Sequence, residues 1–146
     1  MHHARSALQG ADFCLTYADG VADVDLAALL ADHAAHGATA TMTVVQPELQ
    51  FGVARVGENG IVHGFTEKPR SEHWINGGFF CCTADVFDVL AADSVLEREP
   101  LEHLAAAGTL RAFRHRGYWD CMDTYKDAVL LNDLWASGGA PWKLWS

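Results

Sequence analysis

The sequence predicts an α/β domain built on a mixed β-sheet with flanking helices. A strand-like run at residues 13–17, a helical run from about residue 26 and a β-branched run at 38–45 follow in that order. This order favours parallel strands joined by a right-handed crossover. Residues 51–67 read as two strands around a turn containing Asn59-Gly60, a pair typical of antiparallel hairpins. Parallel and antiparallel pairing in one chain together indicate a mixed sheet.

The first helix has recognisable start and stop signals. Either Asp23 or Asp25 can cap its N-terminus, and Gly37 can end it in a left-handed conformation. Its apolar residues recur at helical spacing: Leu26, Leu29, Leu30 and Ala34. The strand before it ends at Ala18-Asp19-Gly20, which places a carboxylate where ligands bind in open α/β sheets. A turn-forming Asp before Gly is the simpler interpretation of Asp19 from these residues alone.

Two helices and a strand are expected after residue 83. Thr83 can cap a short helix, and a second helix starts near Glu99, with Pro100 in its first turn and Gly108 as its stop. Residues 109–115 alternate imperfectly between apolar and polar and read as a strand.

The last helix begins at Asp123 or Thr124 and carries an apolar stripe made of Val129, Leu130, Leu134 and Trp135. A Trp-rich tail, about residues 138–146, follows it and is expected to pack on the domain or on a partner subunit. The chain has no internal repeat, low-complexity segment or obvious linker, so residues 1–146 are expected to form one domain.

Composition argues against two classes of partner. The chain has 10 Lys and Arg against 19 Asp and Glu, a formal net charge of −9. Nucleic acid and anionic membranes need clustered cations, and no basic stripe is present. No run approaches the ~20 apolar residues of a membrane span, and no signal peptide is visible.

His33 and His36 share a helix face, but without an evident third ligand they are a weak metal pattern. Four cysteines without C-x-x-C spacing are expected to be buried reduced thiols, which suits the cytoplasm: Cys14, Cys81, Cys82 and Cys121.

The most informative stretch runs from residue 62 to Pro69. Pro69 lacks an N–H and favours extended geometry at Lys68, so the strand should end there, with Glu67 and Lys68 pointing to opposite faces. A second strand then begins with Asn76-Gly77-Gly78, where glycines let a ligand approach the backbone. An acid, an ammonium, an amide and bare backbone suit a ligand carrying a phosphate, such as a sugar phosphate. The alternative from these residues is a surface turn with a solvated ion pair.

Seven short motifs stand at sensible intervals along nearly the whole chain after about Ala11. They are Tyr17-Ala18-Asp19-Gly20-Val21-Ala22-Asp23, Phe51-Gly52, Glu67-Lys68-Pro69, Ile75-Asn76-Gly77-Gly78-Phe79-Phe80, Glu99-Pro100-Leu101, Met122-Asp123-Thr124 and Ala140-Pro141-Trp142-Lys143. In this order they resemble the sugar-phosphate nucleotidyltransferases, and most closely the branch that uses CTP and glucose 1-phosphate. Each motif alone is weak, but together they make a specific signal.

The resemblance implies a Rossmann-like mixed α/β fold that joins a nucleoside triphosphate to a sugar 1-phosphate and releases pyrophosphate. It also implies a cytoplasmic enzyme that forms homo-oligomers. Asp19 and Asp123 match the two aspartates that hold Mg²⁺ and, with Lys68, are the expected catalytic residues. The positions that match the substrate pocket are Ala18, Gly52, Glu67, Lys68, Asn76 and Gly77. Ala18 departs from the glycine that the family usually has before the metal-binding aspartate.

The chemistry explains these residue types. The oxygen of the sugar phosphate that attacks the α-phosphorus is already ionised at neutral pH, so no protein base is needed. Catalysis then requires that two anions be placed in line and that their repulsion be neutralised. Mg²⁺ takes one or two carboxylates and completes its octahedron with phosphate oxygens and water, and a lysine supplies a point charge.

One part of the family pattern has no match. The family begins with a strand and a loop of the type Gly-Gly-x-Gly-Thr-Arg, followed by a lysine, which grips the triphosphate. The chain therefore looks like the C-terminal half of such an enzyme, whether as a fragment, a truncated gene or a split subunit. One alternative is a non-catalytic module for sugar-phosphate binding or oligomerisation. Another is a metal-dependent glycosyltransferase, because Asp23-Val24-Asp25 resembles a D-x-D motif, although helix capping is the preferred interpretation of that pair.

Overall fold

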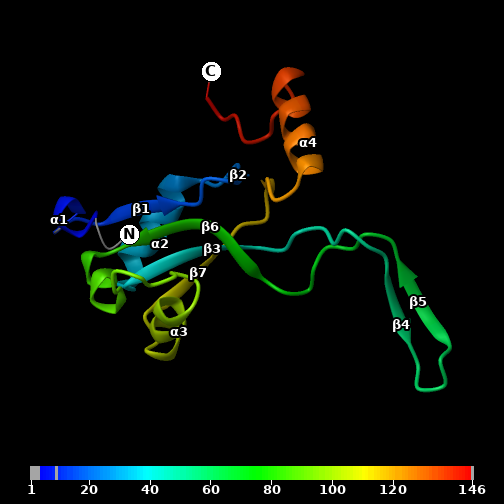
Figure 1. Cartoon of the computed structure of the whole chain (residues 1–146), viewed down its shortest axis with the longest axis horizontal. Helices are drawn as coiled ribbons and strands as arrows, with labels where there is room; N and C mark the ends of the chain where they lie inside the picture. Colours follow the sequence, from blue (N-terminus) through cyan, green and yellow to red (C-terminus); the bar gives the residue numbers. More distant parts are fainter. Residues whose placement is uncertain (1–3, 9, 146) are drawn as a thin grey trace.

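A four-stranded sheet forms the centre of the protein (Figure 1), whose computed structural model describes residues 4–8 and 10–145. In spatial order its strands are β1 (Phe13–Thr16), β6 (Ile75–Cys82), β3 (Ala40–Val45) and β7 (Leu110–Arg114). Strand β6 is antiparallel to both of its neighbours, whereas β3 and β7 are parallel. The prediction of a mixed α/β sheet is therefore confirmed.

Helix α2 (Leu26–His36) connects β1 to β3, as the strand–helix–strand order predicts. Both strands are antiparallel to β6, so they are parallel to each other, but β6 lies between them. The cap is Asp25, whose side chain accepts a 2.9 Å hydrogen bond from the backbone N–H of Ala28. At the other end Gly37 has φ 61°, the left-handed conformation expected of a C-terminal glycine.

The predicted hairpin consists of β4 (Val53–Val56) and β5 (Val62–Thr66), but it does not join the central sheet. It forms a separate two-stranded sheet that projects as an arm (Figure 1). A neck continues the β3–β6 pair outward through hydrogen bonds from Ser71 to Pro47, 2.8 Å, and from Leu49 to Pro69, 2.9 Å. The mixed character of the main sheet therefore comes from β6 and not from the hairpin, contrary to the expectation from sequence.

Two short strands were not predicted. Residues Gly20–Ala22 form β2 and Trp119–Cys121 form β8, and they pair antiparallel, with Gly20 opposite Cys121. Each strand has three residues and no alternating apolar pattern, so local sequence carries little signal for either. Their pairing brings the first quarter of the chain against its last quarter.

The remaining helices are α1 (Arg5–Leu8), the 3₁₀ helix η2 (Ala84–Val89), α3 (Glu99–Ala106) and α4 (Tyr125–Ala136). Pro100 lies in the first turn of α3, as predicted. Thr83 occupies the N-cap position of η2, as predicted, but its side chain makes no capping hydrogen bond. Helix α4 is capped by Thr124, which with Asp127 forms a reciprocal capping box. None of the helices in residues 4–8 and 10–145 is long and apolar enough to cross a membrane.

The core lies on both faces of the sheet, and the two adjacent cysteines of β6 belong to different parts of it. Cys82 packs on one face, in a cluster of buried residues that also contains Ala40, Phe80, Val86, Phe87, Leu90 and Leu104. Cys81 packs with Val24 and with Leu29 of α2 in a second cluster. The two cysteines thus face opposite ways, as expected for neighbours on a strand.

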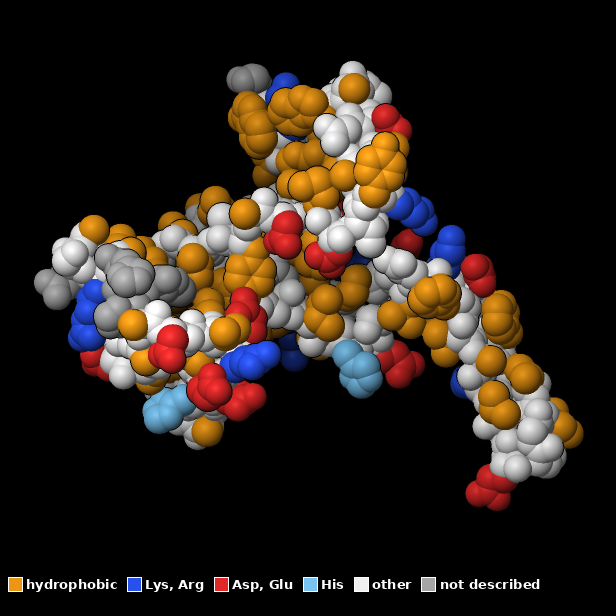
Figure 2. Space-filling model, viewed as in Figure 1, with side chains coloured by type: hydrophobic (Ala, Val, Ile, Leu, Met, Phe, Trp, Pro, Cys, Tyr) orange, Lys and Arg blue, Asp and Glu red, His pale blue; other side chains and the backbone are white. Residues whose placement is uncertain are grey.

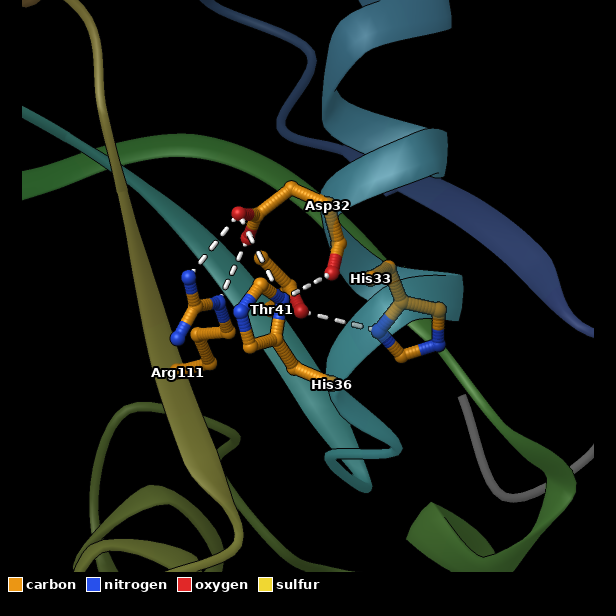
Figure 3. A network of polar contacts seen from close by, with 5 residues as sticks. All are labelled: Asp32, His33, His36, Thr41 and Arg111. Atoms are coloured by element: carbon orange, nitrogen blue, oxygen red, sulfur yellow. Dashed lines mark hydrogen bonds and ion pairs between the residues drawn. The ribbon is translucent and has the colours of Figure 1, made fainter.

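A polar network joins α2 to β3 and β7 (Figure 3). The guanidinium of Arg111 donates to both carboxylate oxygens of Asp32, at 2.6 and 2.9 Å. Nδ1 of His33 lies 2.8 Å from the hydroxyl of Thr41, and both side chains are buried. His36 hydrogen-bonds the backbone oxygen of Asp32. The two histidines thus have structural partners, and residues 4–8 and 10–145 contain no group of three or more His, Cys, Asp or Glu suited to a metal ion.

Apolar side chains gather on the arm and on α4 with the tail that follows it (Figure 2). Phe51 and Phe65 of the arm are 79% and 65% exposed. On α4 the predicted apolar stripe faces largely outward, and the buried residue of this helix is Leu131 instead. In the tail, Trp142 stacks on Tyr118 with ring centroids 5.5 Å apart. Trp145 lies beside Trp135 of α4, at 6.3 Å.

Candidate functional site

The pairing of β2 with β8 brings Asp19 and Asp123 to the same end of a short ladder. Asp19 immediately precedes β2, and its backbone oxygen accepts a 2.9 Å hydrogen bond from the N–H of Met122. Asp123 is the next residue after Met122, and both aspartates are exposed. Two aspartates that are far apart in the sequence therefore lie on neighbouring backbones.

The charges of both carboxylates affect the Cys121 thiol. It donates a 3.3 Å hydrogen bond to Oδ2 of Asp123. Burial, the hydrogen bond and charge of Asp123, and the charges of Asp120 and Asp19 together raise the pKa of the Cys121 thiol to about 12. In the metal-free protein the sulfur therefore stays protonated at neutral pH and is a poor nucleophile. This leaves the two carboxylates as the oxygen donors of the cluster.

A cavity of about 690 Å³ opens beside this ladder, between the neck and α4. Residues 45–51 and 117–120 form much of its wall. Three cationic side chains line it together: Lys68, Arg70 and Lys126. Acidic residues line it as well, namely Glu48, Asp120 and Asp127. A cavity with several convergent cations and hydrogen-bonding groups suits a polar anion such as a phosphate ester.

Lys68 has a conformation that the sequence does not predict. Strand β5 ends at Thr66, and Lys68 adopts φ 44°, the one positive φ of a non-glycine residue in the described part of the chain. The expectation of an extended Lys68, with Glu67 on the opposite face of a strand, is therefore wrong. The neck supplies the reason, because the chain must turn there to pair Pro69 with Leu49. Backbone strain of this kind occurs often where a side chain must be aimed at a ligand.

Gly52 makes room for the side chain of Glu67. A Cβ atom added at Gly52 would lie 2.7 Å from Oε2 of Glu67 and would also clash with the ring of Phe65. Gly52 and Glu67 therefore lie together at the base of the arm, and neither is among the residues that line the cavity.

Asn76 and Gly77 are held by neighbouring protein groups. The amide of Asn76 donates to the hydroxyl of Tyr17 and accepts from the N–H of Gly78, both at 2.8 Å. The indole of Trp119 donates to the oxygen of Gly77 at 2.8 Å. A Cβ at Gly77 would lie 3.1 Å from the backbone oxygen of Thr43. On that side the absence of a Cβ at Gly77 allows strand β3 to come close, and not a ligand. The expectation that this glycine lets a ligand approach the backbone is corrected accordingly.

The candidate residues form three groups: Lys68 in the cavity wall, Asn76 with Gly77, and Asp19 with Asp123. Strand β8 contacts or adjoins each of them. Trp119 lines the cavity with Lys68, and its indole holds the backbone of Gly77. Two residues beyond the strand lies Asp123, beside Asp19. Lys68 thus lines the cavity, Gly77 contacts Trp119 of its wall, and Asp19 and Asp123 lie at the β2–β8 ladder without lining the cavity. Ala18, exposed next to Asp19, belongs to the third group.

Sequence reasoning missed Arg70, Lys126 and Tyr118. Arg70 directly follows the motif Glu67-Lys68-Pro69, and Lys126 lies two residues after the motif Met122-Asp123-Thr124, in the first turn of α4. Their positions next to these motifs could have identified them as candidates. Tyr118 offered no such signal. Burial, together with the charge and hydrogen bond of Asp120, raises the pKa of its hydroxyl to about 12. The phenol therefore remains protonated and can serve as a hydrogen-bond donor in the cavity.

Asp23 and Asp25, which resemble a D-x-D motif, do not form a free pair of carboxylates. Asp25 caps α2 through its side chain. Oδ1 of Asp23 lies 2.9 Å from Nε2 of His115, whose side chain is only 9% exposed. Asp25 is engaged by its cap, and Asp23 lies against His115 although its Oδ1 makes no hydrogen bond in the described part of the chain, which supports helix capping for Asp25 and an internal position for Asp23.

Comparison with known proteins gives a consistent result. The family model described as nucleotidyl transferase matches residues 2–135. Glucose-1-phosphate cytidylyltransferases from Salmonella typhi and Salmonella typhimurium are each 46% identical to this chain over 135 residues. Each alignment covers 91% of this chain and 52% of the relative. The chain thus spans about half the length of the curated relatives it matches.

Solved structures show the same fold at low sequence identity. A Bacillus anthracis protein assigned as a glucose-1-phosphate thymidylyltransferase superimposes with a TM-score of 0.66 at 15% identity, over 91% of this chain and 58% of its own. HddC from Yersinia pseudotuberculosis gives a TM-score of 0.66 at 14% identity, over 92% and 60%. These similarities concern the fold: a mixed sheet with flanking helices.

Proposed function

Because the chain belongs to the nucleotidyl transferase family, we propose that it supplies the sugar-phosphate side of an enzyme that makes CDP-glucose. The reaction transfers a cytidylyl group from CTP to glucose 1-phosphate and releases pyrophosphate. The names of the 46% identical relatives support this choice of substrates. The observation that supports the proposal is the β2–β8 pairing, which joins the backbones of Asp19 and Met122, with Trp119 and Asp120 of β8 lining a cavity that Lys68, Arg70 and Lys126 also line.

In this proposal Lys68 holds the phosphate of the sugar. Its ammonium lines the cavity with Arg70 and Lys126, so the phosphate would meet three cationic side chains there, beside the carboxylates of Glu48, Asp120 and Asp127. The substrate phosphate is itself the nucleophile, so the site needs no general base. Protonated Tyr118 and Cys121 fit this requirement, because neither offers a base at neutral pH. Glu67, Gly52, Asn76 and Gly77 do not line this cavity, and in the proposal they shape the sugar pocket from outside it.

Asp19 and Asp123 fit a magnesium site. They are exposed oxygen donors on adjacent backbones, and the one nearby sulfur is protonated. When bound, Mg²⁺ supplies positive charge that offsets the repulsion between the two phosphate groups. The two residues would hold the ion from opposite strands of the ladder, while Lys68 orients the sugar phosphate from the cavity.

The 146 residues are proposed to be one partial domain of a cytoplasmic enzyme that assembles as a homo-oligomer. The four free thiols of the described residues suit a reducing compartment. The large apolar side chains exposed on the arm and on α4 suit an assembly, because monomers rarely expose such contiguous patches.

Binding of glucose 1-phosphate to the 146-residue chain tests the assignment of Lys68. Titration with Mg²⁺ present, followed by amide chemical shifts, should perturb residues 45–51, 68–70 and 117–120. Lys68→Ala should weaken this binding about 10- to 150-fold, the value of one charge-assisted contact of about 1.5–3 kcal/mol. Lys143→Ala removes the same charge outside the cavity and should leave the affinity unchanged. Equal losses in the two variants would show that Lys68 provides only general positive charge.

A second candidate is a non-catalytic sugar-phosphate-binding or oligomerisation module. The observation that favours it is the coverage, since the matched relatives are about twice as long. The 146-residue chain alone should release no measurable pyrophosphate from CTP and glucose 1-phosphate with Mg²⁺. Mixing it with a polypeptide that carries the Gly-Gly-x-Gly-Thr-Arg loop should restore release if the chain is the sugar-phosphate side of an enzyme. Turnover by the chain alone would contradict the proposal that it is one part of the site.

A further inference from the structure

A pair of thiols faces one another across the antiparallel strands β1 and β6, away from the candidate site. Cys14 and Cys81 are direct partners in the register, and their sulfur atoms are 3.5 Å apart. Cys14 is exposed, whereas Cys81 is buried. Solvent can therefore reach one member of the pair while the other is shielded.

The ladder geometry favours a bond between them. The N–H of Tyr17 donates to the oxygen of Gly78 at 3.0 Å, which is one of the two bonds of a hydrogen-bonded pair, while the N–H of Gly78 donates to Oδ1 of Asn76. Hydrogen-bonded and non-hydrogen-bonded pairs alternate along an antiparallel ladder, which makes Cys14 and Cys81, three positions away, a non-hydrogen-bonded pair. The Cα atoms of such pairs are about 4.5 Å apart, within the range of about 4.4–6.8 Å that disulfides span. Side-chain rotation then suffices to bring the sulfur atoms together.

Neither of the other cysteines competes for this partner. Cys82 faces the opposite side of the sheet, where it packs among buried apolar residues. Cys121 lies in β8 and hydrogen-bonds Asp123. We propose that Cys14 and Cys81 are a redox-sensitive pair that closes into a cross-strand disulfide when the protein meets hydrogen peroxide.

The reaction proceeds in two balanced steps. The exposed Cys14 sulfur attacks peroxide, which breaks the O–O bond and gives a sulfenic acid and water. The Cys81 sulfur then attacks the sulfur of Cys14, the S–O bond breaks, and the hydroxyl leaves as a second water with the thiol proton. Two thiols are oxidised and one peroxide is reduced. Burial, together with the hydrogen bond to Cys14, raises the pKa of Cys81 to about 12, which makes Cys14 the residue that reacts first.

The bond would link the strand that leads to Asp19 with the strand that carries Asn76. Strand β1 ends at Thr16, and β6 contains both Asn76 and Cys81. Oxidation would therefore stiffen the connection between the two sides of the candidate site without altering any residue proposed to bind substrate.

Peroxide treatment of the 146-residue chain tests the pair. Remaining thiols are alkylated in denaturant and counted, and the linked peptides are identified by fragmentation, which separates Cys81 from Cys82. We expect the loss of two of the four thiols, a mass decrease of two hydrogen atoms, a Cys14–Cys81 linkage, and full recovery with dithiothreitol. Oxidised protein should also unfold at a higher denaturant concentration than the reduced protein, because the bridge closes a long loop.

Two variants keep the test decisive. Cys14→Ser changes an exposed residue, so the protein should fold and should keep its three remaining thiols under the same treatment. Cys121→Ser is the matched control and should still lose two thiols. The proposal is overturned if all four thiols survive, if Cys14 is oxidised without a bond to Cys81, if the linkage joins two chains or another pair, or if Cys14→Ser loses thiols as the parent does.

Discussion

Two threonines of β3 differ in their surroundings although both are wholly buried. The hydroxyl of Thr41 lies 2.8 Å from Nδ1 of buried His33 (Figure 3). The hydroxyl of Thr43 has no hydrogen-bond partner in the described part of the chain. A buried polar group without a partner costs free energy, whereas a satisfied one contributes modestly to stability. The same substitution should therefore have opposite consequences at positions two residues apart.

Thr41→Val should lower the free energy of unfolding by about 1–3 kcal/mol, because it leaves the imidazole of His33 buried without its partner. Thr43→Val should be neutral or stabilising, because it replaces an unpaired hydroxyl with a methyl group of similar shape. Urea denaturation followed by circular dichroism measures both. Equal destabilisation in the two variants would mean that the His33–Thr41 contact makes no specific contribution.

At the scale of elements, Asp32 and Arg111 connect α2 to β7 through a bidentate ion pair. The hydrogen bonds from Arg111 are the largest of the effects that lower the pKa of Asp32 below its ordinary value of 3.8. Since the folded pKa is depressed, the stabilisation is fully present above the unfolded pKa. It is lost as the pH falls through the folded value.

The free energy of unfolding of the parent protein should therefore fall more steeply than that of Asp32→Asn as the pH drops below about 4. At neutral pH the parent should be the more stable of the two. Asp133→Asn is the control, because Asp133 is an exposed carboxylate of α4 outside the ion pairs of the described residues. Parallel pH profiles for the parent and Asp32→Asn would contradict a folded-state role of the ion pair.

The elements with local signals could be predicted, and those fixed by distant contacts could not. Asn59-Gly60 predicts the hairpin turn and Gly37 the end of α2, because both need only local backbone conformations. The position of the hairpin outside the sheet depends on the neck, whose pairing between residues 47–49 and 69–71 has no local signature. For the same reason β2 and β8 escaped prediction, since each is too short to show a period and exists only through the other.

The candidate site divides in the same way. The motif order identified Asp19, Lys68 and Asp123 as candidates because their neighbours form recognisable short patterns. The left-handed backbone of Lys68 was not predicted, because the proline after it favours the opposite geometry. Arg70 and Lys126 reach the cavity only once the neck and α4 are in place.

At the scale of the whole molecule, the arm and α4 both project from the central sheet and carry exposed apolar side chains (Figures 1 and 2). An isolated two-stranded hairpin is marginally stable in water, so the arm gains little from its own packing. The proposed homo-oligomer would give these surfaces a partner. The cavity lies between the two projections, so an assembly that covers them would also limit the access of solvent to Lys68.

Asp19 and Asp123 come from the first and last quarters of the chain and lie on neighbouring backbones, and their joint role is the sharpest prediction for the molecule. If both carboxylates hold one Mg²⁺, amide shifts of residues 19–22 and 119–123 should respond to Mg²⁺ in the 146-residue chain. Asp19→Asn and Asp123→Asn should each weaken that response by at least about tenfold, since a hydrogen bond or contact to a charged group is worth about 1.5–3 kcal/mol. The double variant should be little worse than either single variant, because residues that act as one unit are not additive.

Folding should survive these substitutions, because both side chains are exposed and each removes a negative charge from beside another. Asp120→Asn, in the neighbouring strand position, is the control for a general loss of negative charge and should leave most of the Mg²⁺ response in place. Losses at Asp19 and Asp123 that multiply in the double variant would show two independent weak sites. In that case the shared ion would have to be withdrawn, and the ladder of β2 and β8 would retain only its structural role of tying Asp19 to Met122.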